Sequence, residues 1–439
     1  MQKFLHIIPR TIDPSKKQTP KDFTRNNKLT FPKLITFILS ITAGGKSKGV
    51  DMKSGDFFRN AKRSGLWPGA EAIHRSTLTK ARRKIDWQIF QAILGDAVHL
   101  AYECWPQTSK YLWHGLSVFA IDGSCYTLPA TEKIREEFDP QSGLQYPGKG
   151  HFPQCRVSTV YDVFRRLPIA RSVATVNSSE RDEAKSLLSF IPIGSVLLFD
   201  RGYPGYEFIS YLLNAFRGYF VFRCPAQHSF PAVEEFIKSG KQEDEILIVP
   251  SGKYMSKVSA VQRKALNAFS IRIIKLVSPD GTVSVLLTNL YNQTEFTKQK
   301  IIELYFRRWE IESHYRDEKI VLEVEKFHGK NCNSIRQELF AAVIMTVISR
   351  TLMVLSSQLF GEESKEPQFK NAITTLATEA AVLTADNPEQ AVKIFQSILQ
   401  EIYRVKYYRP KLPRPSQPRV TKKSLNRWVF AKIQKLANA

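Results

Sequence analysis

The sequence predicts a mixed α/β protein, in which a helical region precedes an α/β core and a β-rich stretch interrupts that core. Apolar residues recur at helical spacing between residues 29 and 107. From residue 116, short apolar runs rich in Val, Ile and Phe replace that spacing and accompany a helical stretch. Residues 201–311 then form an interval much longer than a simple connection needs, and it contains further strand-like runs.

The first quarter of the chain divides by composition. Residues 1–28 are polar and basic and are expected to form a flexible lead-in, whereas residues 29–110 are expected to form a helical domain. Helical periodicity places its helices at 31–41, at 54–65 with Ser54 at the start, and at 74–103 with a break near Asp86.

The segment 76–84 is expected to expose hydroxyl groups and cations on one side of a helix, and the cations include Lys80, Arg82 and Arg83. A turn containing Pro and Gly precedes it, as in a helix-turn-helix unit whose second helix reads a DNA groove. Two alternatives remain open: a basic surface helix that contacts only phosphate groups, and one that contacts no DNA.

The α/β core is expected at residues 111–215 and again at 294–400. Its first part contains strand-like runs, a helical stretch and a further strand, at 116–122, 156–164, 169–176, 180–191 and 195–200. Asp122 and Asp200 end the first and the last of these strands. Asp is depleted in strands, so its presence there calls for a reason. The structural alternatives are a turn that Asp122 initiates before Gly123, and a salt bridge between Asp200 and Arg201.

Residues 216–293 are expected to form a β-rich insertion. Its strand-like runs lie at 219–224, 245–251, 269–278 and 283–290. The central loop carries Lys253, Lys257, Arg263 and Lys264, which are candidates for DNA contact or simply the charges of a solvated loop.

Polar residues share one stripe of a helix expected between Tyr305 and Lys319. Arg308, Glu312 and Arg316 complete that stripe at helical spacing. A carboxylate bracketed by cations and a phenol suits a metal-dependent site that acts on a phosphodiester. The alternative is a solvated set of salt bridges, because Arg308–Glu312 and Glu312–Arg316 are ordinary i,i+4 pairs.

Asp122, Asp200 and Glu312 together suggest a single metal centre. Two carboxylates from strands and one from a helix would hold a pair of divalent cations, of the kind that activates an attacking oxygen and stabilises a leaving one. Ligands that are all oxygen favour Mg²⁺, with Mn²⁺ as a substitute, over zinc.

The end of the chain contains a long apolar segment and a basic tail. Residues 339–360 are apolar, but Arg350 lies in their middle, so a buried core helix is expected and a membrane span is not. A helical segment follows at 377–404. Residues 401–439 form a Pro-rich tail that is expected to contact the DNA backbone; the alternative is a solubilising tail.

Composition and charge limit the class of protein. A hydrophobic fraction of 43% indicates a folded chain, and 64 Lys and Arg against 41 Asp and Glu give a net charge of +23. Nucleic acid is the commonest partner of so basic a protein. Five scattered cysteines without a C-x-x-C pair favour reduced thiols in a cytosol and no zinc site. No Gly-rich phosphate loop of the Walker type is present, which argues against ATP-driven chemistry.

The chain resembles the IS4 family of DDE transposases of bacterial insertion sequences. The resemblance lies in the spacing Tyr305-x2-Arg308-x3-Glu312-x6-Lys319 and in the stretches AIDGSCYTLPAT and LLFDRGYPG around Asp122 and Asp200. SERDEAKSLL, SVLLTNL and FHGKNCNSIRQEL are also similar, so the resemblance covers roughly residues 116–358. At none of these positions does the sequence depart from the family pattern.

The resemblance implies a fold, an activity and partners. The fold is an RNase H-like core interrupted by a β-rich insertion, which agrees with the order of the expected strands. Asp122, Asp200 and Glu312 would bind two Mg²⁺ ions and catalyse DNA cleavage and strand transfer. Double-stranded DNA, namely the terminal inverted repeats of the element and a target, would be the partner of a homodimer in the bacterial cytoplasm, at the nucleoid and without a membrane. The cations and phenol expected to contact DNA are Tyr305, Arg308, Lys319, Arg316 and Arg201, with Lys80, Arg82 and Arg83 in the helical domain.

Two other functions use the same residues. An RNase H-like nuclease would cut DNA without joining it, and only strand transfer to a target separates it from a transposase. A DNA-binding regulator descended from a transposase would not cut at all. That alternative predicts loss of the acidic triad, which is intact in this sequence.

Overall fold

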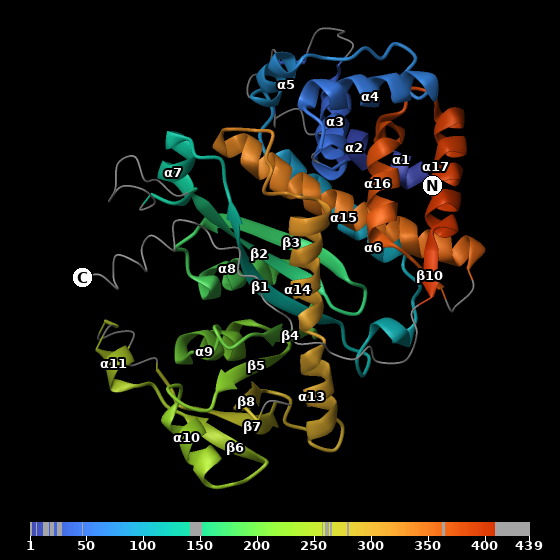
Figure 1. The fold of residues 1–439 in the computed structure, drawn as a ribbon. Helices are drawn as coiled ribbons and strands as arrows, with labels where there is room; N and C mark the ends of the chain where they lie inside the picture. The colour runs from blue at the N-terminus through green and yellow to red at the C-terminus, as the bar shows by residue number, and fades with distance from the viewer. Residues whose placement is uncertain are drawn as a thin grey trace.

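A mixed sheet of eight strands lies at the centre of the structure, a computed structural model, with the strand order β3-β2-β1-β4-β5-β8-β7-β6 (Figure 1). The structure describes residues 2–5, 7–11, 17, 22–23, 29–45, 47–140, 152–256, 258–259, 263, 266–278, 281–361 and 365–408. The strands of the sheet are β1 (Val118–Thr127), β2 (Gln154–Asp162), β3 (Leu167–Thr175), β4 (Val196–Phe199), β5 (Tyr219–Pro225), β6 (Glu243–Ile248), β7 (Phe269–Val277) and β8 (Val283–Thr288). A separate two-stranded sheet pairs β9 (Lys365–Pro367) with β10 (Lys406–Tyr408).

Strand directions divide the large sheet into two parts. The strands β1, β2 and β3 are antiparallel neighbours, whereas β4 pairs in parallel with both β1 and β5. From β5 the sheet continues through β8, β7 and β6, and all of these pairs are antiparallel. The predicted insertion at 216–293 therefore extends the central sheet. Its first predicted strand is β5, which is part of the parallel centre.

The first predicted strand continues well beyond Asp122. The expected end at Asp122 was wrong, because β1 runs on to Thr127 and Asp122 pairs with Thr159 in the middle of the strand. The long partner strand β2 supplies main-chain hydrogen bonds along this whole length, so the Asp-Gly pair does not turn the chain.

Helices cover the sheet and form a second layer at one end. They are α1 (Gln2–Leu5), α2 (Ile7–Thr11), α3 (Phe31–Ala43), α4 (Val50–Arg63), α5 (Arg75–Arg82), α6 (Gln88–Cys104), α7 (Glu132–Phe138), α8 (Glu180–Leu187), α9 (Tyr206–Ala215), α10 (Pro231–Lys238), α11 (Gly252–Met255), α13 (Lys298–Phe306), α14 (Trp309–Arg316), α15 (Cys332–Phe360), α16 (Phe369–Thr378) and α17 (Pro388–Arg404). Short 3₁₀ segments occur at η2 (Ser109–Tyr111), η3 (Leu188–Phe190) and η5 (Ala380–Thr384), and η4 (Asp317–Val321) is a π-helical segment.

The N-terminal helices share a core with the C-terminal ones. α3 packs against α15 and α16, and Figure 1 shows α3, α4, α16 and α17 grouped beside the sheet. Trp67 donates its indole hydrogen to the Thr384 carbonyl at 2.9 Å, and Lys33 pairs with Asp386 at 2.7 Å. The predicted break near Asp86 is confirmed by the gap between α5 and α6. α4 begins at Val50, before the predicted start at Ser54, whose buried hydroxyl accepts a bond from the Ile73 amide.

α15 is the central helix of this layer. It is the one helix among the described residues that is long and apolar enough to cross a membrane, but most of its apolar stretch is buried inside the structure. It packs against α6, α3, α16, α17 and the strand β3. The expectation of a core helix at residues 339–360 is therefore confirmed.

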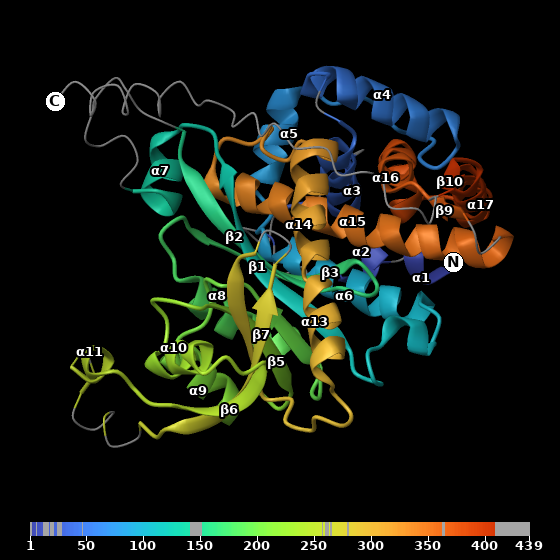
Figure 2. The same ribbon diagram turned by 60° about the horizontal axis from the view of Figure 1, so that its bottom comes forward.

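The predicted continuous helix from Tyr305 to Lys319 is interrupted twice. α13 ends at Phe306, and tight i→i+3 bonds from the Arg307 and Arg308 amides form a turn before α14 begins at Trp309. After Arg316 the helix widens into the π segment η4. Figure 2 shows α13 and α14 following one another along the sheet, although the helix is not continuous.

Arg82 joins the N-terminal helices to α15 through a buried ion pair. Its guanidinium Nη1 lies 2.8 Å from Glu338 Oε1, and Nη2 donates to the Ser334 carbonyl at 2.9 Å. The arginine is 3% exposed, so its expected place on an exposed DNA-binding face is not supported by the structure. Arg82 points inward because α5 packs on α15 through this side, while its neighbours Lys80 and Arg83 are exposed.

Replacing Arg82 with Ala is expected to lower the free energy of unfolding by about 3–5 kcal/mol, because the buried Glu338 carboxylate would lose its cation. Urea denaturation would measure the change. Arg83→Ala, at the exposed neighbouring position, is the matched control and should change the same quantity by less than about 0.5 kcal/mol. Equal small effects of the two variants would contradict a stabilising role for the buried pair.

Candidate functional site

The three predicted carboxylates come together at one edge of the parallel strands. Ala120 of β1 pairs with Leu198 of β4, and Asp122 and Asp200 each lie two residues further along their chains. Both carboxylates therefore stand at matching heights on the same face of the sheet. Glu312 belongs to α14, which packs against β1.

A single guanidinium lies among these three side chains. Arg308 Nη2 is 2.8 Å from Glu312 Oε1 and 4.0 Å from Asp200 Oδ1, and its Nη1 is 3.5 Å from Asp122 Oδ2. The arginine side chain is only 3% exposed, whereas that of Glu312 is 41% exposed. Arg308 is therefore the inner wall of a site that opens toward solvent at the carboxylates.

The three carboxylates carry more negative charge than the single Arg308 guanidinium can balance. Burial raises the pKa of Asp122 to about 6; the Arg308 guanidinium opposes that shift, and Asp200 and Glu180 add to it. One guanidinium cannot neutralise three carboxylates, so the ionised site attracts further positive charge. Two other acidic residues, in contrast, each have a guanidinium of their own: Glu180 pairs with Arg156 at 3.0 Å, and Glu318 pairs with Arg171 at 2.6 Å.

The donor chemistry of the site fits a hard divalent cation. All three side chains offer carboxylate oxygens, which Mg²⁺ and Mn²⁺ prefer. Among the described residues, however, no group of three or more acidic, His or Cys side chains stands close enough to hold an ion as arranged here. The Arg308 guanidinium lies between the three carboxylates, so in this structure the arginine takes the place that a metal ion would occupy.

Tyr305 and Lys319 contact the elements that carry these side chains. Tyr305 is 1% exposed, its hydroxyl has no hydrogen-bond partner among the described residues, and burial raises its pKa to about 12. Its ring lies 6.0 Å from the Arg308 guanidinium, so it packs behind the arginine. Lys319 is half-buried, and its ammonium donates to Ser124 Oγ and to the Cys125 carbonyl, both at 2.8 Å.

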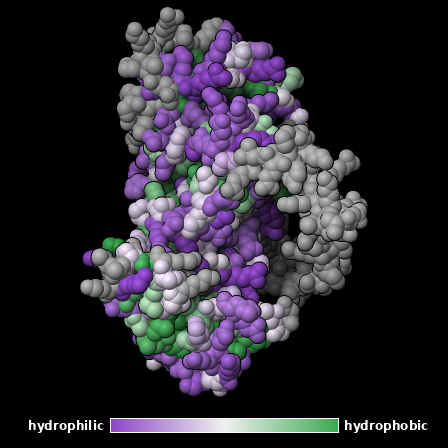
Figure 3. All heavy atoms as spheres, turned by 90° about the vertical axis from the view of Figure 1, so that its left-hand side faces the viewer, coloured by the Kyte–Doolittle hydropathy of each residue, from purple (hydrophilic) through white to green (hydrophobic). Residues whose placement is uncertain are grey.

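The other predicted DNA contacts are exposed where the structure describes them. Arg201, Arg316, Lys80 and Arg83 all have exposed side chains, and so does Arg263 in the insertion. The side chain of Lys253, the residues Lys257 and Lys264, and the tail from residue 409 lie outside the described residues. In the view of Figure 3, hydrophilic side chains cover most of the face, and hydrophobic ones gather at its lower end, over the insertion.

Sequence reasoning missed two carboxylates beside the triad. A Cβ atom added at Gly123 would lie 3.5 Å from Glu180 Oε1, and one added at Gly202 would lie 3.4 Å from Glu180 Oε2. Glu180 therefore lies against the two glycines that follow Asp122 and Asp200. Glu318, in η4 directly after α14, is fully buried. The signal that could have found Glu180 is its place in the stretch SERDEAKSLL. For Glu318, an acidic residue in a half-apolar segment, the sequence carried no such signal.

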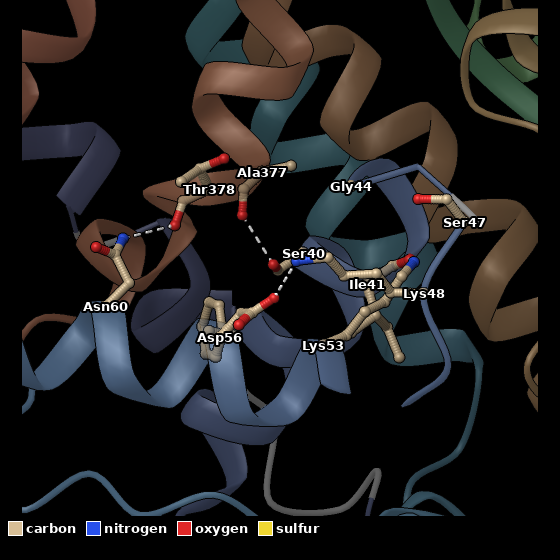
Figure 4. A pocket seen from close by; sticks show the side chains of 11 residues that line it. Ser40, Ile41, Gly44, Ser47, Lys48, Lys53, Asp56, Asn60, Ala377 and Thr378 are labelled. Carbon is tan, nitrogen blue, oxygen red and sulfur yellow. Dashed lines mark hydrogen bonds and ion pairs between the residues drawn. The ribbon is translucent and has the colours of Figure 1, made fainter. Parts of the chain in front are cut away.

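A cavity elsewhere in the molecule is unrelated to the triad. It has a volume of about 310 Å³ and lies between α3, α4 and α16, where Lys53, Asp56 and Asn60 line it (Figure 4). Ser40 donates to the Ala377 carbonyl at 2.8 Å and Asn60 to the Thr378 carbonyl at 3.1 Å across this space. None of the three triad carboxylates lines it.

Comparisons with known proteins agree on one family. Residues 113–348 match the family described as "Transposase DDE domain". The chain is 24% identical to the transposase InsG of insertion sequence element IS4 from Escherichia coli K12, over 64% of this chain and 61% of that protein. It is 26% identical to the putative transposase InsZ of the same organism, over 30% of this chain and 44% of that protein. These matches span less than two thirds of either relative.

Similarity extends to a further relative and to a solved structure. The putative transposase y4zB of Sinorhizobium fredii is 23% identical over 46% of this chain and 54% of that protein. Among solved structures, a piggyBac transposase synaptic complex with hairpin DNA aligns with a TM-score of 0.44 and 11% identity. That alignment covers 96% of this chain and 84% of the other.

Asp122→Asn is expected to stabilise the metal-free protein at pH 8 by on the order of 1–3 kcal/mol. The pKa of Asp122 lies above its ordinary value of 3.8, at about 6. The ionised carboxylate therefore costs stability increasingly as the pH rises from about 4 to about 6, and fully above that range. The cost is mostly gone at pH 4, where the folded group is protonated and the unfolded one is about half protonated. Urea denaturation of both proteins with a chelator at pH 4 and pH 8 would measure the difference. Equal destabilisation at both values would show that burial does not penalise the charge.

Proposed function

Because this chain belongs to the IS4 family of DDE transposases, we propose that it is a cut-and-paste enzyme that moves its own insertion sequence. It would bind the terminal inverted repeats of the element, cleave the element ends and join their 3′-hydroxyl groups to target DNA. The observation that carries the proposal is that Asp122, Asp200 and Glu312 each have a carboxylate oxygen within 4.0 Å of the Arg308 guanidinium.

The fold proposed for the catalytic part is RNase H-like. Its support is the central strand order β3-β2-β1-β4-β5, with β2 antiparallel and β4 parallel to β1. The strands β6, β7 and β8 would then be the insertion, and they enlarge the same sheet beside the site.

Asp122, Asp200 and Glu312 are the residues that would hold two Mg²⁺ ions, or Mn²⁺ in their place. When bound, such ions lower the pKa of an attacking oxygen and stabilise the charge on the leaving one. The reaction class is hydrolysis of the phosphodiester at the element end, which frees a 3′-hydroxyl group, followed by transfer of that end to a target phosphodiester.

The cations of the site have separable roles in this proposal. Arg308 would neutralise a phosphate beside the scissile bond once the carboxylates no longer hold it, and Tyr305 would support it from behind. Lys319 can donate three hydrogen bonds and spends two on Ser124 and Cys125, so one remains for a phosphate oxygen. Arg201 and Arg316, which are exposed, would extend the contact along the DNA backbone. Lys80 and Arg83 would make a second contact with DNA from the N-terminal helices. Arg82 is buried and is not proposed to contact DNA.

The partner would be double-stranded DNA, first as the element ends and then as the target. A homodimer would bring two ends together. The proposed location is the bacterial cytoplasm, on the nucleoid.

Glu312→Gln is expected to reduce Mg²⁺-dependent cleavage of a labelled duplex carrying the terminal repeat by roughly 100-fold or more, since one metal-binding carboxylate is lost. The matched control is Glu310→Gln, on the same helix, which removes a carboxylate paired with Arg166 at 3.3 Å and should leave cleavage unchanged.

Three results are informative here. Cleavage that needs Mg²⁺, is lost in Glu312→Gln and is followed by joining to a second duplex would establish a transposase. Cleavage without joining would indicate a nuclease instead. Specific binding without cleavage by the wild type under any divalent metal would reject the enzymatic proposal in favour of a regulator.

A further inference from the structure

The helix that carries Glu312 is fastened to the strand that carries Asp122 at three successive points. Asp122, Ser124 and Tyr126 alternate along β1 and so share one face of the strand. Tyr315 donates its hydroxyl hydrogen to the main-chain carbonyl of Asp122 at 2.6 Å. Lys319 donates to Ser124 Oγ at 2.8 Å, and the Tyr126 hydroxyl donates to Glu318.

The first of these contacts links two members of the proposed triad directly. Tyr315 follows Glu312 by one turn on α14, and the carbonyl that it binds belongs to Asp122 itself. The hydroxyl also lies 3.3 Å from the Val157 carbonyl of β2, so it reaches into the sheet between the paired strands. Any slide of α14 along β1 would break this bond and change the separation of the two carboxylates.

A buried ion pair holds the lower end of the same segment. Glu318 and Arg171 are both 0% exposed, and Arg171 Nη2 lies 2.6 Å from Glu318 Oε1. Arg171 comes from β3, and its Nη1 donates to the Leu339 carbonyl of α15 at 2.8 Å. Burial would raise the pKa of Glu318, but Arg171 and His314 outweigh it and hold the pKa below its ordinary value. The pair therefore stays charged and connects the Glu312 segment to both β3 and α15.

The π-helical turn allows consecutive residues to serve these contacts. In an α-helix, neighbouring residues point about 100° apart, so they do not face one surface together. In η4, where the Leu322 amide bonds to the Asp317 carbonyl, the wider turn brings both Glu318 and Lys319 to β1. Such turns are rare and are concentrated at functional sites.

We propose that Tyr315 and Glu318 are positioning residues that set the height of α14 along β1, and with it the placement of Glu312 relative to Asp122. Neither side chain is offered to DNA or metal, because Tyr315 is 6% and Glu318 0% exposed. The effect on catalysis rests on the proposed function. The effect on geometry concerns only the placement of the metal-binding carboxylates. Misplacement of a catalytic group by about 1 Å can cost on the order of 100-fold in rate.

The test is Tyr315→Phe, which removes one hydroxyl and keeps the ring. The binding of Mn²⁺ to the DNA-free protein, measured by titration calorimetry, should weaken by about 10-fold. The turnover number for terminal-repeat cleavage should fall by about 10- to 100-fold while KM for the duplex changes little, because the DNA contacts are untouched.

Tyr206→Phe is the matched control. Tyr206 is also buried, at 7% exposed, and its hydroxyl also donates to a main-chain carbonyl, that of Asn267 at 2.8 Å. It should lose stability to the same extent as Tyr315→Phe, with Mn²⁺ affinity and turnover unchanged. Equal stability losses with wild-type Mn²⁺ affinity in both variants would overturn the proposal and leave Tyr315 a purely structural residue.

A second variant covers the case in which Tyr315→Phe does not fold. Tyr126→Phe removes the hydroxyl bond to Glu318 from the strand side and should weaken Mn²⁺ binding in the same direction; wild-type affinity in a folded Tyr126→Phe would count against the proposal. If the wild type binds Mn²⁺ but does not cleave DNA, the proposed function fails while the comparison of Mn²⁺ affinities still decides the positioning role.

Discussion

The parallel pairing of β1 with β4 is the constraint on which the rest of the site depends. It places Asp122 and Asp200 at equal height on one face, although two strands and the helices α7 and α8 separate them in the sequence. Parallel neighbours need a long crossover connection, and β2, β3 and α8 are contained in that connection here. The same crossover brings Glu180, at the start of α8, against the glycines that follow both aspartates.

Charge is distributed unevenly around these strands. Glu180 and Glu318 each have a guanidinium of their own, from Arg156 and Arg171. Asp122, Asp200 and Glu312 share Arg308 alone among the ion pairs that the described part of the chain forms at this site. A fully paired carboxylate gains little from a metal ion, whereas a cluster with too few cations is stabilised by one. The acids nearest the triad thus serve structure, and the triad keeps its capacity for a further cation.

The helical layer explains how distant parts of the chain support the site. α15 packs against β3 on one side and against α3, α6, α16 and α17 on the other. Arg171 contacts α15 from the sheet, and Arg82 contacts it from the N-terminal helices. The N-terminal helices share this core, because helices from the other end of the chain bury their apolar faces.

The sequence by itself determined the local features and singled out Asp122, Asp200 and Glu312 as candidates. Periodicity and composition act over a few residues, and they indicated four features of this kind. These are the strand-like apolar runs, the break near Asp86, the buried nature of residues 339–360 and the spacing of Arg308 and Glu312. Tertiary structure alone decided which side chains face inward. Arg82 looked exposed beside Lys80 and Arg83 until Glu338, far away in sequence, became its partner. Likewise β1 runs past Asp122 because β2 pairs with it, and the helix at 305–319 is interrupted where Arg308 turns toward three carboxylates. Such outcomes depend on contacts between residues far apart in the chain, and local patterns carry no information about them.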